Sequence, residues 1–181
     1  IARADLMADA YKDYFGEEIK LTTPNAGWEF IKRLAHNKVI TVPGTNEIAK
    51  AVGAPGQKDA PIGLATAGKL RMNETDGFVL GVIPEVIPTI GYCYPAYGLL
   101  VRNAPHPNAA KLLVRELMTE EGASAWTQDE GCFSTNPNLS YNELDPIGNL
   151  EAWEKAAWSL DIGTSMKYSR ELLDFWITER R

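Results

Sequence analysis

The sequence has little of what nucleic-acid binding or membrane insertion requires. Its 181 residues carry a formal net charge of −6, and the lysines and arginines are scattered without a polybasic run. Because phosphate binding needs a basic face, this charge argues against a nucleic-acid partner. No apolar stretch reaches the roughly 18 residues that a transmembrane helix needs. With 45% hydrophobic and 23% charged residues, the composition is that of a globular chain of one domain, or of one and part of a second.

Catalytic and metal-binding signatures are also lacking. His36 and His106 stand outside any metal or triad spacing, and an isolated histidine is a poor general base. Cys93 and Cys132 form no metal-type pair; they predict either two free buried thiols or one disulfide in an oxidising compartment. No phosphate loop, nucleophile elbow, dinucleotide fingerprint or zinc-protease motif occurs. The sequence therefore predicts no catalytic residue, no metal and no cofactor.

Apolar residues recur at helical spacing in seven segments. Gly16 predicts the end of the first helix, and Thr23 and Pro24 predict the N-cap and first residue of the second. Acidic residues are expected on the outer, solvated faces of these helices, and the five tryptophans are expected to pack. The predicted helices are 4–15, 24–35, 47–52, 108–118, 120–128, 150–160 and 165–178.

Short apolar runs between these helices are typical of strands. They occupy residues 39–42, 62–65 and 78–83, and a longer run at 87–101 is interrupted by prolines, as in an edge or bent strand. Because strands alternate with helices over roughly the first 100 residues, the sequence predicts an α/β fold with βαβ units. Residues 136–149, rich in Pro, Asn and Gly, predict a long surface excursion.

Six segments between roughly residues 20 and 140 form a recognisable series, and the most informative is the strand, turn and helix of 96–122. The others are 27–35 (GWEFIKRLA), 42–46 (VPGTN), 60–65 (APIGLA), 77–85 (GFVLGVIPE) and 130–136 (EGCFSTN). No single segment is diagnostic, whereas their order is. In this order they resemble the extracellular solute-binding proteins of ABC importers, of the ferric-iron-binding-protein-like family.

Members of this family have two α/β lobes joined by crossover strands, with the ligand in the cleft. The resemblance implies a lobe of the type II periplasmic-binding-protein kind, with a mixed sheet and flanking helices, plus part of the other lobe. Residues 1–90 would form the second lobe without its first strand, 91–135 a crossover strand and a helix of the first lobe, and 136–181 the C-terminal helices returning to the second lobe. The chain is thus expected to be a C-terminal fragment, and an unpaired strand edge near Leu99 predicts self-association.

The function implied by the resemblance is transport without chemistry. Such a protein captures a small polar or anionic solute between its lobes and delivers it to the permease subunits in the membrane. Its location would be periplasmic or extracellular, with or without a lipid anchor. The alternative is the effector-binding domain of a transcription regulator, which has the same two-lobe architecture. Iron-binding members carry adjacent tyrosines where this sequence has residues 66–69 (TAGK), so ferric ion is expected less than an organic or anionic solute.

Two turns are candidate ligand-binding sites. The first, Gly44, Thr45 and Asn46, opens a predicted helix, so it is either an anion-binding turn or an ordinary cap. The second, from Thr66 through Gly68 to Lys69, follows a predicted strand at the edge where α/β sheets bind ligands. Lys69 and the nearby Arg71 are either ligand contacts or solvated cations.

A third candidate is the pair Tyr92 and Tyr94. In a strand these side chains share one face. They are expected either to line the ligand cleft or to be half-buried strand residues, which β-propensity favours.

Overall fold

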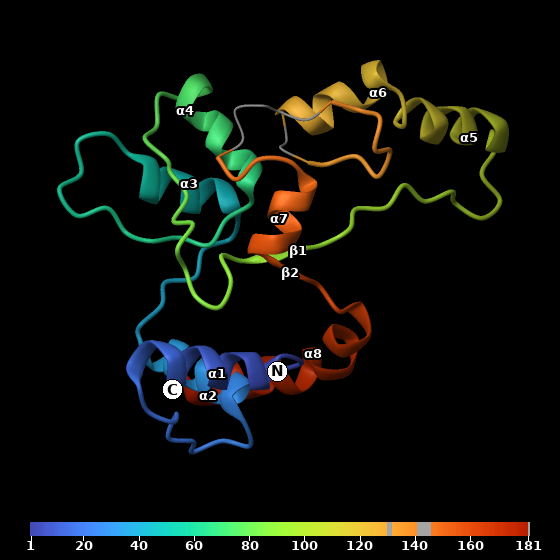
Figure 1. Ribbon diagram of the computed structural model, residues 1–181. Coiled ribbons are helices and arrows are strands. Elements are labelled where there is room, and N and C mark those ends of the chain that lie inside the picture. The colour runs from blue at the N-terminus through green and yellow to red at the C-terminus, as the bar shows by residue number, and fades with distance from the viewer. Residues whose placement is uncertain (130–131, 141–145, 181) are drawn as a thin grey trace. The chain divides into compact units, whose positions relative to one another are not determined.

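The computed structural model describes residues 1–129, 132–140 and 146–180 (Figure 1). The chain divides into two compact units. Unit 1 comprises Ile1–Thr41, Glu85–Tyr92 and Trp158–Arg181, and unit 2 comprises Val42–Pro84 and Cys93–Ala157. None of the helices in the described part is both long and apolar enough to span a membrane. The predicted surface excursion at 136–149 and the resemblance segment at 130–136 lie partly outside the described residues.

Unit 1 is a cluster of three helices. Helix α2 (Ala26–His36) packs against both α1 (Ala4–Phe15) and α8 (Ile162–Glu179) (Figure 1). Trp28, only 6% exposed, is the large side chain at the α2–α8 contact. Its ring meets the ring of Phe175 edge-on at 4.9 Å and that of Tyr168 at 6.5 Å between centroids. The apolar face of α2 therefore supplies the core of this unit.

The ends of the first two helices test the predicted caps. Gly16 ends α1 in the left-handed conformation, with φ of 71°, as its sequence position predicts. The predicted cap of α2 is wrong by two residues, because Asn25 and not Thr23 is the N-cap. The Asn25 Oδ1 accepts hydrogen bonds from the backbone N–H groups of Gly27 (3.0 Å) and Trp28 (3.2 Å). Asparagine caps as well as threonine does, so the sequence offered two competing signals.

Unit 2 is built from short helices. They are α3 (Thr45–Gly53), the 3₁₀ turn η1 (Ala67–Arg71), α4 (Met72–Thr75), α5 (Pro107–Glu116), α6 (Glu120–Ser124), η2 (Ala125–Asp129) and α7 (Leu150–Ala156). The four helices predicted in this unit all form with shifted ends, whereas η1 and α4 were not predicted. The π-helical turn η2 continues α6, and α7 ends before the predicted residue 160 because the next residues enter a strand.

Extended pairing in the described residues is limited to one small parallel sheet. It joins β1 (Tyr92–Cys93) to β2 (Trp158–Ser159). The backbone N–H of Trp158 donates to the Gly91 carbonyl oxygen at 3.1 Å. With 49% of the chain in helices, the described part is helix-rich with two very short strands. The predicted α/β fold with a mixed sheet is therefore not confirmed.

The predicted strand at 78–83 is wrong, and its hydrogen bonds show why. The Val79 N–H donates to the carbonyl oxygen of Gly53, at the end of α3, at 2.9 Å. The Asn73 side chain donates to the Leu80 carbonyl oxygen (2.9 Å) and accepts from the Leu80 N–H (2.7 Å). Helix ends and one side-chain amide thus satisfy backbone groups that a neighbouring strand would otherwise bond.

The predicted strands at 39–42 and 62–65 do not form either, and of 87–101 only Tyr92–Cys93 is a strand. The Val39 carbonyl oxygen accepts a hydrogen bond from the Arg180 guanidinium, at 3.0 Å, and not from a neighbouring strand. Leu99 lies outside any strand and is 83% exposed. Because a strand needs a partner that its own sequence does not contain, an apolar run indicates a strand only where the fold supplies a neighbour. The lobe boundaries at 90 and 135 stay a prediction.

The tryptophans do not all pack as predicted. Trp28 is buried, whereas Trp126 is 53% exposed. The remaining three, Trp153, Trp158 and Trp176, are half-buried. Their helical spacing marks which face they share, but burial depends on whether another element covers that face.

Candidate functional site

The candidate site is a cavity of about 470 Å³ within unit 2. Asn46 enters it from the first turn of α3, and Lys69 and Arg71 enter from η1, which contacts α3. The structure therefore brings together one residue from each of the two predicted turns. The lining residues are Asn46, Lys69, Arg71, Met72, Thr75 and Asp76.

Local structure fixes the two cations at the cavity. The 3₁₀ turn starts after Thr66, whose carbonyl oxygen accepts from the Lys69 N–H at 3.0 Å. Gly68 is buried within this turn, and Lys69 and Arg71 are half-buried. Met72 is buried directly after them and gives the cavity an apolar wall. The choice between ligand contacts and solvated cations for Lys69 and Arg71 stays a prediction.

The start of α3 differs from the predicted cap by Thr45 or Asn46, whereas the anion-binding turn stays a prediction. Its N-cap is Gly44, which has no side chain, so Thr45 and Asn46 belong to the first turn and neither is the N-cap. The Gly44 φ of −161° is ordinary extended backbone, open to any residue. A Cβ on Gly44 would lie 3.1 Å from the Glu47 Oε2, so this carboxylate already stands beside the helix N-terminus. Because Glu47 offsets the positive end of the helix dipole, attraction for an anion comes mainly from the cations of η1.

The remaining predicted residues lie outside the cavity lining. Thr45 is half-buried in α3, and Thr66 is exposed at the start of η1. Tyr92 lies in β1 and Tyr94 follows it, each 55% exposed, so they are more open than half-buried strand residues. Asn46 and Lys69 thus line one cavity, and Thr45, Thr66 and Tyr94 are not part of its lining.

Sequence reasoning missed Thr75 and Asp76. Both stand at the end of α4, where Asp76 is the C-cap and the Thr75 hydroxyl donates to its Oδ2 at 2.7 Å. Gly77 follows with φ of 68°, a conformation that favours glycine. An Asp-Gly pair that begins five residues after Arg71 is a helix-stop signal, and reading it would have placed a carboxylate near the predicted cationic turn.

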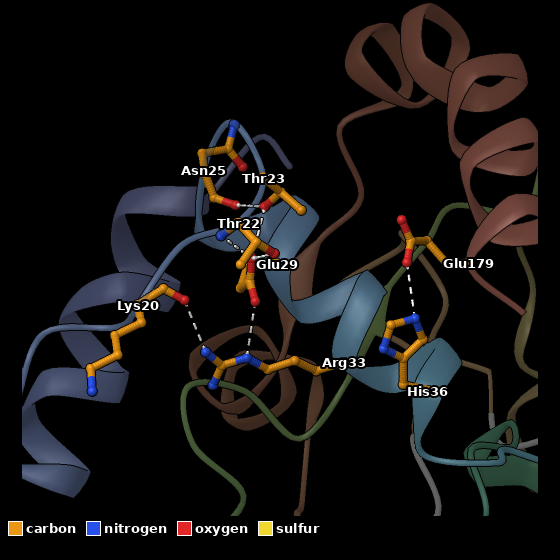
Figure 2. Close-up of polar contacts among 8 residues, drawn as sticks. All are labelled: Lys20, Thr22, Thr23, Asn25, Glu29, Arg33, His36 and Glu179. Carbon is orange, nitrogen blue, oxygen red and sulfur yellow. Dashed lines mark hydrogen bonds and ion pairs between the residues drawn. The ribbon is translucent and has the colours of Figure 1, made fainter.

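Unit 1 holds a polar cluster centred on Glu29, which is 4% exposed (Figure 2). The Glu29 Oε2 accepts hydrogen bonds from the Thr22 N–H (2.8 Å), the Thr22 hydroxyl (3.1 Å) and the Thr23 hydroxyl (3.2 Å). The Arg33 Nε donates to its Oε1 at 3.3 Å. The Thr22 backbone N–H is the main cause of a lowered pKa for Glu29, against burial, which raises it. The expectation that acidic residues are solvated is wrong for Glu29.

The same unit gives His36 an acidic partner. Its Nε2 lies 2.9 Å from the Glu179 Oε2, at the end of α8 (Figure 2). The prediction of an isolated histidine is therefore wrong for His36. Sequence alone could not predict this pair because Glu179 lies far from His36 along the chain. A second cavity, of about 520 Å³, lies nearby, but Arg33 in its lining is already bonded to Glu29 and to the Lys20 carbonyl oxygen.

The two cysteines form no disulfide; Cys93 is half-buried and Cys132 is exposed. The prediction of two buried thiols is thus wrong for Cys132. Burial, and secondarily the charge of Glu154, raises the pKa of Cys93. Because the thiolate is the reactive form, we expect Ellman's reagent to label Cys132 quickly and Cys93 slowly near pH 8. The rates of Cys93→Ser and Cys132→Ser chains, with and without urea, check this, and equal rates in the folded chains would contradict it.

Within the described ranges, no group of three or more His, Cys, Asp and Glu side chains is placed to hold a metal ion. Comparison of the chain with protein-family models, curated proteins and solved structures gave no match. A function for the cavity is therefore argued from the residues that line it.

Proposed function

We propose that this chain captures a small polar or anionic solute, as part of the solute-binding component of an ABC importer. The observation that carries the proposal is the cavity of unit 2. It is lined by Asn46 of the first predicted turn together with Lys69 of the second turn and the nearby Arg71. Two half-buried cations and an amide donor are groups that hold carboxylates and phosphates. The cavity volume of about 470 Å³ lies within the range of small-molecule pockets.

The remainder of the proposal is supported by the sequence resemblance. A chain of this family would hold the solute without chemical change and pass it to a membrane permease. The cavity is nevertheless local to unit 2, so its ligand binding is testable on this chain by itself.

Changing Lys69 to Met is expected to weaken anion binding by roughly ten- to hundredfold, because a charged hydrogen bond contributes about 1.5–3 kcal/mol. Methionine keeps the apolar stem and removes the ammonium group. Isothermal titration calorimetry of the 181-residue chain with acetate, butanoate and inorganic phosphate measures the effect. The matched control is Lys50→Met, which removes the same charge from α3 at an exposed position outside the cavity.

Two outcomes would contradict the proposal. One is that none of the three anions binds at millimolar concentration. The other is that Lys69→Met and Lys50→Met weaken binding equally, which would indicate attraction by net charge and not by the cavity.

A further inference from the structure

The cavity of unit 2 contains both signs of charge. Lys69 and Arg71 line it from η1, and the carboxylate of Asp76 lines it from the end of α4. A purely anionic solute would meet Asp76 as a like charge, which reduces its affinity.

Lys69 and Asp76 do not neutralise each other directly. Both residues belong to the described part of the chain, and the structure places no ion pair within 4.0 Å between them. The Asp76 Oδ2 is held by the Thr75 hydroxyl at 2.7 Å, which orients the carboxylate. Two opposite charges that line one cavity without touching are arranged for a ligand that carries the complementary charges at its two ends.

We infer that the solute is a zwitterion, a small molecule with a carboxylate and an ammonium group. Lys69, with Arg71 beside it, binds the carboxylate, and Asp76 accepts hydrogen bonds from the ammonium group. Asn46 donates its side-chain amide to the carboxylate end, and Met72 contacts the methylene groups between the two ends. This inference rests on the proposed function, because it specifies the ligand of the same cavity.

The experiment compares matched pairs of acids. The ω-amino acids glycine, β-alanine, 4-aminobutanoate and 5-aminopentanoate each have a counterpart that lacks the amino group, from acetate to pentanoate. Calorimetric titration of the 181-residue chain is expected to show one amino acid binding roughly ten- to hundredfold tighter than its counterpart, the value of one charged hydrogen bond. The length of that amino acid reports the span between Lys69 and Asp76.

Two variants assign the effect to Asp76. Asp76→Asn keeps the side-chain shape and removes the charge, so it should abolish the preference for the amino acid and leave the affinity for its counterpart unchanged or higher. Asp76→Glu moves the carboxylate outward by one methylene group and should shift the optimum to an amino acid one methylene shorter. The matched control is Glu74→Gln, which removes the same charge from exposed α4 outside the cavity lining and should leave the preference intact.

Failure of this inference and failure of the proposed function give different results. If acids bind in a Lys69-dependent way but the amino group adds no affinity, the ligand is an anion, and only the inference is overturned. It is also overturned if Glu74→Gln changes the preference as much as Asp76→Asn does. If neither member of any pair binds, both the inference and the proposed function are overturned.

Discussion

Replacing Trp28 with alanine is expected to lower the free energy of unfolding of unit 1 by about 3–5 kcal/mol, the usual cost of truncating a buried tryptophan. Trp28 is the large buried side chain at the contact of α2 with α8. Its edge-on contact with Phe175, at 4.9 Å between centroids, contributes about 0.5–1.5 kcal/mol beyond the buried area. A loss of this size is comparable with the whole stability of a small domain, so the helix cluster should unfold at low urea.

Urea titration followed by far-UV circular dichroism measures this effect, because it does not depend on the tryptophan that is removed. Trp126→Ala is the matched control, since that side chain is exposed and its truncation should change stability by about 0.5 kcal/mol or less. Trp28→Phe should lose less than Trp28→Ala because it keeps an aromatic ring against Phe175. Equal urea midpoints for Trp28→Ala and Trp126→Ala would show that the α2–α8 contact does not hold unit 1 together.

The second large effect is expected at Glu29, where exchange for glutamine should cost about 1.5–3 kcal/mol of stability at neutral pH. Glutamine keeps the shape but removes the charge that strengthens the hydrogen bonds from Thr22, Thr23 and Arg33 (Figure 2). The amide nitrogen of glutamine is itself a donor, and it would face one of the donor groups that now bond the Glu29 carboxylate. The matched control is Glu151→Gln in the exposed ion pair with Lys155, where the loss should be about 0.5 kcal/mol or less.

The Glu29 contribution should also depend on pH. Its folded-state pKa is lowered, chiefly by the Thr22 N–H, so the carboxylate binds a proton more readily in the unfolded chain. The stabilisation is therefore fully present above the unfolded pKa, about 4.3–4.5, and is lost as the pH falls through the lower folded pKa. Urea melts between pH 7 and pH 3 should show a steeper acid loss for the native chain than for Glu29→Gln. Parallel curves for the two chains would contradict a buried, ionised Glu29.

The helices were the part of the fold that sequence could predict. The periodicity of α1 and the glycine after it gave both bounds of that helix, because helical hydrogen bonds join residues four apart and capping acts within one turn. The cap of α2 was misplaced because Thr23 and Asn25 compete within three residues for the same role. In the structure the Asn25 side chain caps the helix, and the Thr22 and Thr23 hydroxyls donate to Glu29.

The strands could not be predicted in the same way. Residues 78–83 have the composition of a strand, yet Asn73 and the end of α3 take their hydrogen bonds. A strand is stabilised by a neighbour that is remote in sequence, and nothing within an apolar run says whether that neighbour is present. For the same reason the α/β fold class, inferred from alternating runs, went beyond what local patterns can establish.

The sequence predicted only part of the candidate site. Sequence alone determined the two turns, the cationic character of residues 69–71 and the absence of catalytic motifs, because each depends on neighbouring residues only. Tertiary structure alone decided that Asn46 and Lys69 line the same cavity and that Asp76 adds an opposite charge to it. It also decided that neither Tyr92 nor Tyr94 belongs to the cavity lining. It also decided that Glu29 is buried and that His36 pairs with Glu179. Burial and ion pairing are properties of segments brought together by packing, so their physical cause lies in the fold and not in any one stretch of chain.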